Sequence, residues 1–392
     1  MTATLSEFAR RLNVETAFSV LAVAKALKSQ GKDVVELEIG DSPFESTKSA
    51  KSAGEQAIRE NQSHYCPSPG LPIFRAEAAR FVKEEFNIPA TAENIVVGAG
   101  AKIFQQYFCE AFLNPGDGAL VFSPHFPTFI PNIERRGARA VLAPLSQEQE
   151  FRPDLKAIRQ FLETDKSPKA IILNSPHNPT GSMISEAELL QIIGLCESKG
   201  ITLLVDETYR DMAFGGPLKV AASLSDSVIS VSSLSKTWGL PGIRIGWLVC
   251  RDKKKMETLL AAKEQIFITN SVVDEEIALR FLLRKSEFAP AIFDTMKRNF
   301  SVLSDWMANQ DALEWVVPQG GVVCFPRFAD SHPVDEDRFY RILNEQYQTY
   351  VGPGHWFEMP RRYMRIGYGW PTTADLAHGL SAISAAAKAA RK

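Results

Sequence analysis

A lysine in the second half of the chain stands where a lysine that only adds solubility would be out of place. Lys236 follows an apolar run, Val228–Val231, and a hydroxyl-rich segment, Ser232–Ser235, and a turn rich in glycine and proline comes after it. An amine that attacks an aldehyde must be neutral and held in position, and such surroundings can do both. The sequence therefore predicts that Lys236 is a nucleophilic amine.

A carboxylate ends another strand pattern. The segment Ile201–Val205 is mostly apolar, and Asp206 follows it. Ligands of open parallel sheets bind beyond the carboxyl ends of the strands, and a carboxylate buried there is costly unless a cation or a donor meets it. A protonated ring nitrogen would be such a cation, and a helix N-cap at Asp206 is an equally good explanation. Tyr209 would face the same side and could reach a ring hydroxyl, although core packing explains a lone tyrosine better.

The turn Asn174–Gly181 also comes after an apolar run, and it contains two prolines. Prolines fix the backbone, and an X-Pro bond can be cis. A rigid turn of this kind can aim the amide of Asn178 at a ligand oxygen. A tight turn without a chemical role explains an isolated Asn-Pro better, but the position at the end of a parallel strand favours the ligand contact.

Small and hydroxyl-bearing residues indicate an anion site. Val97–Lys102 runs from a strand pattern through a glycine into the helix pattern Ile103–Phe112, so backbone N–H groups and the helix dipole would meet an anion such as phosphate. Ser233, Ser235 and Arg244 add donors, and arginine can hold a phosphate with two parallel hydrogen bonds. This turn has neither the G-x-G-x-x-G nor the Walker pattern, which argues against a dinucleotide or ATP.

Two further side chains belong to strand patterns. Phe126 follows one, and its ring could stack on a flat heterocycle, whereas Phe129 is expected in the core. Arg365 lies within the apolar segment Tyr363–Gly367, where a buried guanidinium needs an anionic partner. A protein carboxylate would satisfy Arg365, and so would the α-carboxylate of a substrate.

The composition is that of an ordinary globular protein. Of the 392 residues, 45% are hydrophobic, which is enough for a large core, and the length predicts two domains. The 44 Lys and Arg residues nearly balance the 46 Asp and Glu residues, so the net charge of −2 predicts neither a nucleic-acid nor a membrane partner. The five cysteines are scattered without a CxxC pair and the N-terminus lacks a signal-peptide core, so we expect reduced thiols, no metal site and a cytoplasmic location.

Short β-branched runs alternate with longer amphipathic stretches as far as Val273. This alternation predicts an α/β fold, in which a mostly parallel sheet is covered by helices on both faces. Beyond Val273 long charged helices precede two strand-like pieces, which predicts a smaller α+β domain that an N-terminal helix at Ala17–Gln30 would join. Strands are expected at Val34–Ile39, Ile95–Gly98, Ala119–Ser123, Ala140–Ala143, Ala170–Asn174, Thr202–Asp206, Val228–Ser232, Ile245–Cys250, Val322–Phe328 and Tyr363–Tyr368, and helices at Ile103–Phe112, Asp154–Leu162, Glu186–Lys199, Asp274–Arg284 and Ala289–Gln310.

Together, and in their order along the chain, the motifs resemble the class I/II aminotransferases, the fold-type-I pyridoxal-phosphate enzymes of the aspartate aminotransferase superfamily. The resemblance extends from about Val34 to about Gly369 and includes Tyr65, Gly70 and Arg75. It implies a fold-type-I transferase whose large domain has a mostly parallel, seven-stranded sheet covered by helices. The implied limits are 46–274 for this large domain and 275–392 for a small α+β domain, which the N-terminal segment 1–45 joins.

The resemblance also implies catalytic roles. Lys236 would form the internal aldimine and then move the proton that leads to a pyridoxamine intermediate. Asp206 would keep the pyridine nitrogen of pyridoxal phosphate protonated, so that the ring withdraws electrons. Tyr209 would contact the 3′-oxygen of the ring. The implied cofactor-binding residues are Gly100, Ala101, Lys102, Phe126, Asn178, Asp206, Tyr209, Ser233, Ser235, Lys236, Arg244 and Tyr65.

The implied substrates are an L-amino acid and a 2-oxo acid. Arg365 would pair with the α-carboxylate, assisted by Asn178 and by the backbone at Gly40. The segment Gly40–Phe44 departs from the commoner Gly-Glu/Gln-Pro-Asp-Phe, which leaves the substrate open. Lys102 matches a lysine that recognises a distal carboxylate in one subgroup, which hints at a dicarboxylic substrate; a lysine near the cofactor phosphate is the simpler explanation.

Active sites shared between two subunits are implied as well. Tyr65 would reach the cofactor phosphate of the other subunit, and Asn270 lies in a segment that approaches the neighbouring site, so we expect a homodimer. The same scaffold could instead carry a carbon–sulfur lyase, a decarboxylase, or an oxidase or cyclase that acts on an unusual amino acid. A pyridoxal-phosphate-sensing regulator without turnover is a remote alternative, because the segment before the first strand is too short for a DNA-binding domain.

Overall fold

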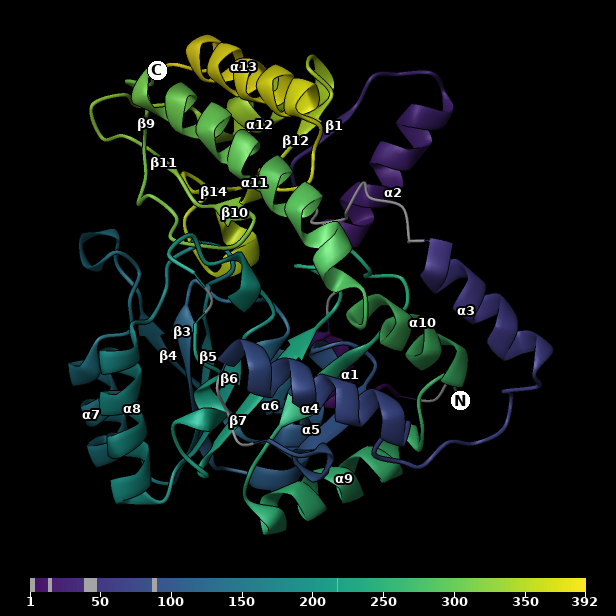
Figure 1. The fold of residues 1–392 in the computed structure, drawn as a ribbon. Coiled ribbons are helices and arrows are strands. Elements are labelled where there is room, and N and C mark those ends of the chain that lie inside the picture. Colours follow the sequence, from purple (N-terminus) through teal and green to yellow (C-terminus); the bar gives the residue numbers. More distant parts are fainter. Residues whose placement is uncertain (1–3, 13–15, 39–47, 87–89, 217) are drawn as a thin grey trace.

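The central element is a seven-stranded sheet with the strand order β2-β8-β7-β6-β5-β3-β4 (Figure 1). A computed structural model describes residues 4–12, 16–38, 48–86, 90–216 and 218–392. The strands from β3 to β7 pair in parallel, whereas β8 is antiparallel to both β7 and β2. The predicted mostly parallel, seven-stranded sheet is thus confirmed. Its strands are β2 Ile95–Gly98, β3 Gly118–Ser123, β4 Arg139–Pro144, β5 Pro168–Asn174, β6 Thr202–Asp206, β7 Val228–Ser233 and β8 Gly246–Val249.

Helices cover both faces of the sheet, which is why its inner strands are apolar without alternation. On one face, helices α5, α6 and α9 pack on side chains such as Val121 and Leu204. On the other, α7 and α8 pack on Leu203 and Val205, and α4 and α10 cover the end of the sheet around Trp247. These helices are α4 Pro72–Phe86, α5 Lys102–Phe112, α6 Phe129–Arg135, α7 Leu155–Thr164, α8 Glu186–Lys199, α9 Lys253–Phe267 and α10 Val272–Leu282.

Helix α8 shows how local sequence sets the ends of an element. Ser185 and Glu188 form a capping box, in which the serine hydroxyl accepts from the Glu188 N–H and the Glu188 carboxylate accepts from the Ser185 N–H. Gly200 ends the helix in the left-handed conformation, with φ of +65°. The structure therefore has this helix at the predicted residues, and its end aligns strand β6.

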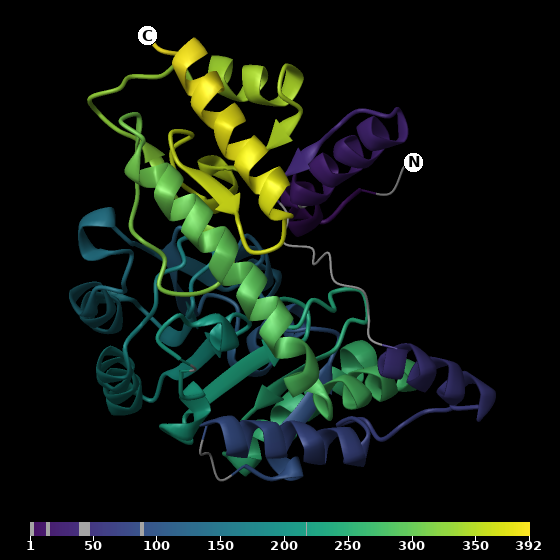
Figure 2. The same ribbon diagram turned by 45° about the horizontal axis from the view of Figure 1, so that its top comes forward.

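A second group of elements stands beside the sheet, and in Figure 2 it forms a separate layer that the long helix α11 connects to the rest. It contains the three-stranded sheet β10-β14-β13 and the pair β11-β9. Strand β1 pairs in parallel with β12, which ties the N-terminal segment to this group. Its elements are α11 Lys285–Ala308, β9 Leu313–Glu314, β10 Val323–Cys324, β11 Arg327–Phe328, α12 Glu336–Glu345, β12 Thr349–Tyr350, β13 Gly352–Pro353, β14 Met364–Gly367 and α13 Thr373–Ala389, together with α2 Thr16–Ser29 and β1 Val35–Glu36 from the N-terminal part. Helix α3 Lys48–Arg59 packs instead on α10, and α1 Glu7–Arg11 lies beside α6, where Arg135 contacts the Phe8 ring.

The single strand predicted at Val322–Phe328 is wrong. The chain there forms two short strands, β10 and β11, which belong to different sheets. Pro326 lies between them, and because proline has no N–H it cannot continue a ladder of hydrogen bonds. The domain limits at residues 46 and 275 stay predictions.

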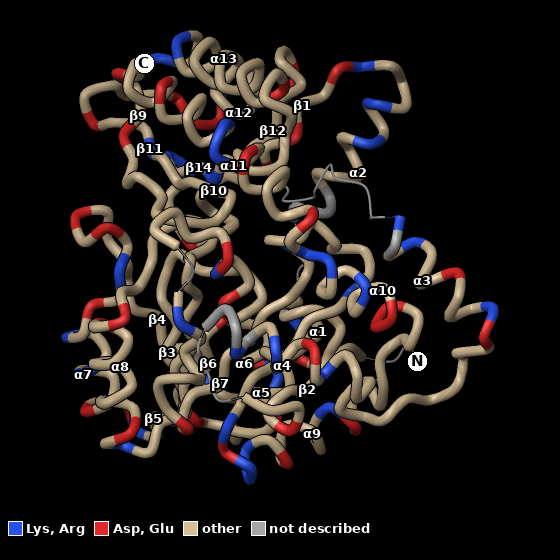
Figure 3. The backbone as a smooth tube through the Cα atoms, viewed as in Figure 1, with Lys and Arg blue, Asp and Glu red and all other residues tan. Residues whose placement is uncertain are grey.

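The surface agrees with the small net charge. Along the described part of the chain, Lys and Arg residues are interspersed with Asp and Glu residues, without a region of one sign (Figure 3). All five cysteines are buried free thiols, as predicted. Within the described ranges, no helix combines the length and the apolar character that a membrane span requires.

Candidate active site

Three neighbouring strands end in polar side chains at one edge of the sheet. Asn174 is the last residue of β5, Asp206 of β6 and Ser233 of β7. Asn174 pairs in register with Asp206, and its amide Nδ2 donates to the Asp206 backbone oxygen over 2.9 Å. The carboxyl ends of adjacent parallel strands thus bring the predicted residues Asp206 and Ser233 to one edge, with Asn174 beside them, as expected for an α/β ligand site.

Asp206 is a buried carboxylate with neutral hydrogen-bond donors. Its Oδ1 accepts from the Thr208 hydroxyl at 2.6 Å and from the Thr208 N–H at 3.1 Å, and its Oδ2 accepts from Gln105 Nε2 at 3.3 Å. Burial raises the pKa of Asp206, and the Thr208 and Gln105 bonds work in the opposite direction. Within the described residues no lysine or arginine pairs with it. A helix N-cap at Asp206 was the alternative explanation for this carboxylate. In the structure Asp206 instead accepts hydrogen bonds within a short turn at Thr208, and the helical turn that follows has Tyr209 at its N-cap.

The turn after β5 and strand β14 meet at Arg365. Its Nη1 donates to Asn178 Oδ1 over 3.0 Å, and its Nη2 donates to the backbone oxygen of Glu38. Asn178 is itself fixed, because its N–H donates to Asn174 Oδ1 over 2.7 Å. The guanidinium also lies 4.9 Å from the centroid of the Phe357 ring. Arg365 is half-buried in this arrangement and lines the cleft.

An anion cradle lies around Arg244. Its Nη1 donates to Ser235 Oγ at 3.3 Å and to the Pro241 oxygen at 2.9 Å, and its Nη2 donates to the Ala99 oxygen at 3.0 Å. Gly100 adopts φ of +77°, and a Cβ there would lie 2.4 Å from Arg244 Nη2. Any other residue would have to adopt this left-handed backbone conformation and displace the Arg244 guanidinium.

Serine hydroxyls and the start of α5 complete the cradle. Ser233 Oγ accepts from the Ser235 N–H at 3.2 Å, and both serines are buried. At Gly246 a Cβ would lie 2.5 Å from the Ser232 oxygen and 2.8 Å from the Gly100 carbonyl carbon, so β8 can approach the turn only without a side chain. Because α5 begins at Lys102, its first N–H groups and its dipole are available to an anion here.

Lys236 lies in the turn that leaves β7, and its side chain is half-buried. The next residue, Thr237, donates through its hydroxyl to the Thr208 backbone oxygen over 3.3 Å. The hydroxyl of Thr208 also donates to Asp206. Thr237 and Thr208 therefore link the turn that contains Lys236 to the turn that contains Asp206. Tyr209 is buried beside them, and burial raises its pKa to about 12, although the charge of Arg365 works in the opposite direction.

A cleft of about 800 Å³ is lined by Lys102, Phe126, Arg244 and Arg365, among other residues. Phe126 is half-buried in its wall, while Phe129 is in the core, as predicted. The exposed Lys102 lines the cleft as well. The cleft therefore presents an aromatic ring and several cations, which suits a flat, anionic ligand.

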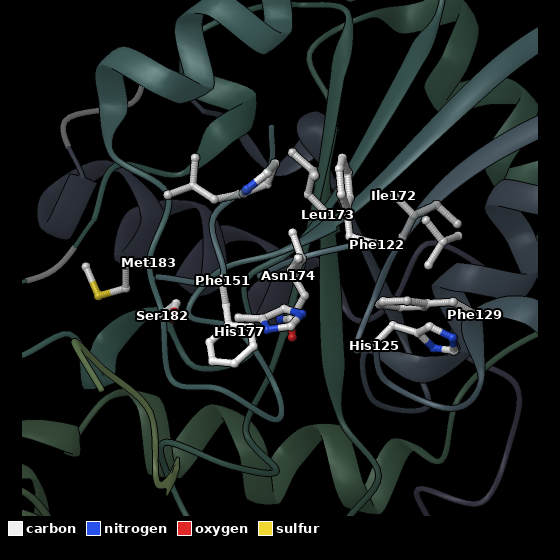
Figure 4. Close-up of a pocket in the computed structure, with 14 residues that line it drawn as sticks. Phe122, His125, Phe129, Phe151, Ile172, Leu173, Asn174, His177, Ser182 and Met183 are labelled. Atoms are coloured by element: carbon white, nitrogen blue, oxygen red, sulfur yellow. The ribbon is translucent and has the colours of Figure 1, made fainter. Parts of the chain in front are cut away.

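A smaller cavity of about 20 Å³ lies behind the Asn174 turn and has room for a single water molecule (Figure 4). His177 lies at its rim and contacts Thr180, with Nδ1 and Oγ1 2.8 Å apart. Burial lowers the pKa of His177 to about 3, so this histidine is neutral. The cavity is too small for a substrate or coenzyme.

Some expected residues lie elsewhere. Tyr65 is 83% exposed and does not line this cleft. Gly40 lies outside the described residues. The ordering of Asp206 and Asn178 depends on Gln105 and Asn174, to which the sequence argument gave no role. Asn174 could have been found, because it ends the strand next to Asp206, but Gln105 carries no motif.

The fold is α/β, and the groups at the carboxyl edge of its sheet suit a flat, anionic ligand. Among the described residues no cluster of His, Cys, Asp or Glu could hold a metal ion. The sequence model of "Aminotransferase class I and II" matches residues 32–383. The chain belongs to this family and is an aminotransferase.

Curated relatives span most of the chain. It is 29% identical over 360 residues to a probable aspartate/prephenate aminotransferase of Aquifex aeolicus, covering 89% of this chain and 90% of that protein. It is 27% identical to an aspartate aminotransferase of Pyrococcus horikoshii, covering 87% of each. Among solved structures, the aspartate aminotransferase of Thermus thermophilus with maleate has a TM-score of 0.89 at 22% identity, covering 98% of this chain and 100% of that one, which supports the fold.

Proposed function

We propose that this chain uses pyridoxal phosphate to move an α-amino group between an L-amino acid and a 2-oxo acid. The observation that carries the proposal is the buried carboxylate of Asp206, which has neutral donors but no cation among the described residues. A protonated ring nitrogen would supply the missing charge and offset the cost of burying the carboxylate.

The cradle fits the phosphate of that cofactor. Ser233, Ser235 and Arg244 supply hydroxyl and guanidinium donors, and the start of α5 adds backbone N–H groups. Gly100 and Gly246 leave the space that a Cβ would fill. The cleft wall at Phe126 offers a ring face for stacking. When bound, pyridoxal phosphate supplies an electron-withdrawing ring with which amino groups can be exchanged.

The chain's own groups then have distinct tasks. Lys236 Nζ acts as the nucleophile and as the carrier of a proton, because it is the amine in the turn that Thr237 joins to Asp206. Asp206 holds a proton on the ring nitrogen. Tyr209 and Asn178 are buried donors for the ring oxygen, and a buried tyrosine whose pKa is about 12 keeps its proton at neutral pH.

Arg365 binds the substrate α-carboxylate through its guanidinium, with Asn178 fixing its orientation. A dicarboxylic amino acid is the first substrate to test, because Lys102 lines the cleft and two of the relatives carry aspartate in their names. A cytoplasmic homodimer with shared sites completes the proposal.

A single half-reaction tests this function. The enzyme loaded with pyridoxal phosphate is mixed with one amino acid at a time, without an acceptor, and its visible spectrum and the products are followed. We expect loss of the visible absorbance and release of one equivalent of the 2-oxo acid, which a second 2-oxo acid reverses. Release of ammonia or carbon dioxide with the original spectrum restored would favour a lyase or a decarboxylase, and a spectrum unchanged by any amino acid would favour a sensor.

A further inference from the structure

A cluster of buried polar groups lies where the loop 65–71 meets α9 and α10. Lys263 of α9 is fully buried, and its Nζ donates to the Ser68 backbone oxygen. Glu275 of α10 is fully buried, and its Oε2 accepts from the Leu71 N–H over 2.6 Å. The two side chains thus hold the loop from both sides, and the proposed chemistry uses neither of them.

We call Lys263 and Glu275 with the loop 65–71 the clamp. The segment between α9 and α10 adds contacts to it. Asn270 Nδ2 donates to Glu275 Oε1 over 2.8 Å, and the Asn270 backbone oxygen lies 3.9 Å from Cys66 Sγ. Ser68 Oγ donates to the Ile268 oxygen over 2.9 Å. Two side chains of the loop thus contact backbone oxygens of this segment.

The far end of the loop is fitted to strand β2. The Pro69 oxygen accepts from the Val97 N–H over 2.8 Å. Gly70 has φ of +118°, and a Cβ there would lie 2.4 Å from a methyl carbon of Val97 and 3.3 Å from Glu275 Oε2. The loop consequently has one conformation in which all of these contacts are made at once.

Burying the charged forms of Lys263 and Glu275 costs free energy, so their presence in the clamp needs an explanation. Burial lowers the pKa of Lys263 to about 8, against the attraction of Glu275, and burial raises the pKa of Glu275, against its bonds from Asn270 and Leu71. Buried charged groups contribute little net stability compared with apolar residues, but they can select one conformation. A conformational role for Lys263 and Glu275 therefore explains them better than stability does.

The loop begins with a large, exposed side chain. Tyr65 is 83% exposed and directly precedes Cys66, and Ile268, which Ser68 contacts, is 54% exposed. We propose that Lys263 and Glu275 are positioning residues that hold the loop 65–71 so that Tyr65 reaches the phosphate of the cofactor bound to a second copy of this chain. The inference rests on the proposed function, which supplies the cofactor and the dimer.

The test is a double-mutant cycle read as cofactor affinity. Pyridoxal phosphate is titrated into the full-length protein stripped of cofactor, for the wild type, Lys263→Met, Tyr65→Phe and the double variant. We expect Lys263→Met to weaken binding roughly tenfold, as does Tyr65→Phe, and the double variant to be no weaker than either single one, because both act through the same contact. Lys255→Met is the matched control, since Lys255 of α9 donates to the Ser227 oxygen, away from the loop, and it should bind like the wild type.

Thermal unfolding and sedimentation check that each variant is folded and has the same assembly. If Lys263→Met does not fold, Glu275→Gln takes its place, because it keeps the shape and removes the charge. The inference is overturned if Lys263→Met causes the same loss of affinity in the wild type and in the Tyr65→Phe background, since the clamp would then act through β2 or on folding. An unchanged affinity in Tyr65→Phe or in Lys263→Met would overturn it as well. In these cases a wild type that binds the cofactor and turns over leaves the proposed function intact; a wild type that binds no cofactor ends both.

Discussion

Arg365 Nη1 and Asn178 Oδ1 lie 3.0 Å apart, which joins strand β14 to the turn after β5. The two residues are far apart in the chain: Asn178 follows a strand of the seven-stranded sheet, whereas Arg365 lies in the three-stranded sheet. Asn178 can receive this bond in a fixed position because Asn174 Oδ1 holds its N–H. The cation that would bind a substrate carboxylate is therefore oriented by the same turn that faces the cofactor site.

Arg365→Lys should separate substrate binding from cofactor binding. A lysine keeps the charge but loses the planar pair of donors, so it cannot bond Asn178 and a carboxylate in the same way. We expect the KM for both substrates to rise roughly tenfold or more, with the affinity for pyridoxal phosphate unchanged. Steady-state kinetics and a cofactor titration measure this, with Arg362→Lys as the control, because Arg362 pairs with Asp330 over 2.7 Å and does not line the cleft. An unchanged KM would remove Arg365 from the substrate site.

Asp206→Asn should retain the cofactor and lose turnover. The amide cannot stabilise a protonated ring nitrogen, although it occupies the same volume. We expect the half-reaction to slow by roughly 10²-fold, in the range measured when a preorganised electrostatic contact is removed. Stopped-flow spectra of the loaded variant measure the rate, and Asp252→Asn, which alters a carboxylate that caps α9, should react like the wild type. A full-speed half-reaction in Asp206→Asn would contradict the role of Asp206.

Gly100→Ala should weaken the phosphate cradle. The new Cβ would lie 2.4 Å from Arg244 Nη2 and displace the guanidinium. Gly116→Ala is a close match, because Gly116 has φ of +86° with nothing within 4 Å of its Cβ position. Both variants should lose about 1 kcal/mol of stability from the backbone conformation. Only Gly100→Ala should bind pyridoxal phosphate roughly tenfold more weakly in a fluorescence titration; equal affinities would place the phosphate elsewhere.

Glu38 should make stability depend on pH. Burial raises the pKa of Glu38 to about 7, and the unfolded value is 4.5, so between these values the folded chain binds more protons than the unfolded chain. Stability must therefore fall as pH rises through this window, by up to about 3 kcal/mol from this residue.

Glu38→Gln removes this titration. Urea unfolding at pH 5 and pH 8 should show that the variant gains stability relative to the wild type as the pH rises. The pKa of Glu207 is also raised to about 7, but Glu207 titrates in both proteins and cancels in the difference. A difference that stays constant with pH would show that the Glu38 carboxyl is ionised in the fold at both pH values.

The strands and the polar residues at their ends were predictable from the sequence, because each apolar run marks a strand and the residue that ends the run lies at the ligand-binding edge of the sheet. Thr202–Asp206 and Glu186–Lys199 form the expected strand and helix, since an apolar run and a capping box leave few alternatives. Placing Asp206 and Asn178 near each other required only that parallel strands end at one edge.

Other features depend on contacts that a linear pattern does not carry. Gln105 reaches Asp206 from a helix face, and nothing in its neighbours marks it. The clamp joins the loop 65–71 to Lys263 and Glu275, which lie 195 and 204 residues from their partners along the chain, and single charged residues in amphipathic helices are ordinarily solvent-exposed. The division of Val322–Phe328 into two strands could not be predicted from the sequence, because each half pairs with a different distant strand.

The most direct test of the central claim is the identity of the amine that holds the cofactor. The loaded enzyme is reduced with borohydride, digested and mapped by mass spectrometry, beside the variant Lys236→Ala. We expect one phosphopyridoxyl group, on the peptide that contains Lys236, and in the variant no such group and no half-reaction, although some cofactor still binds. A reduced adduct on another lysine such as Lys102, or transamination by Lys236→Ala, would contradict the account.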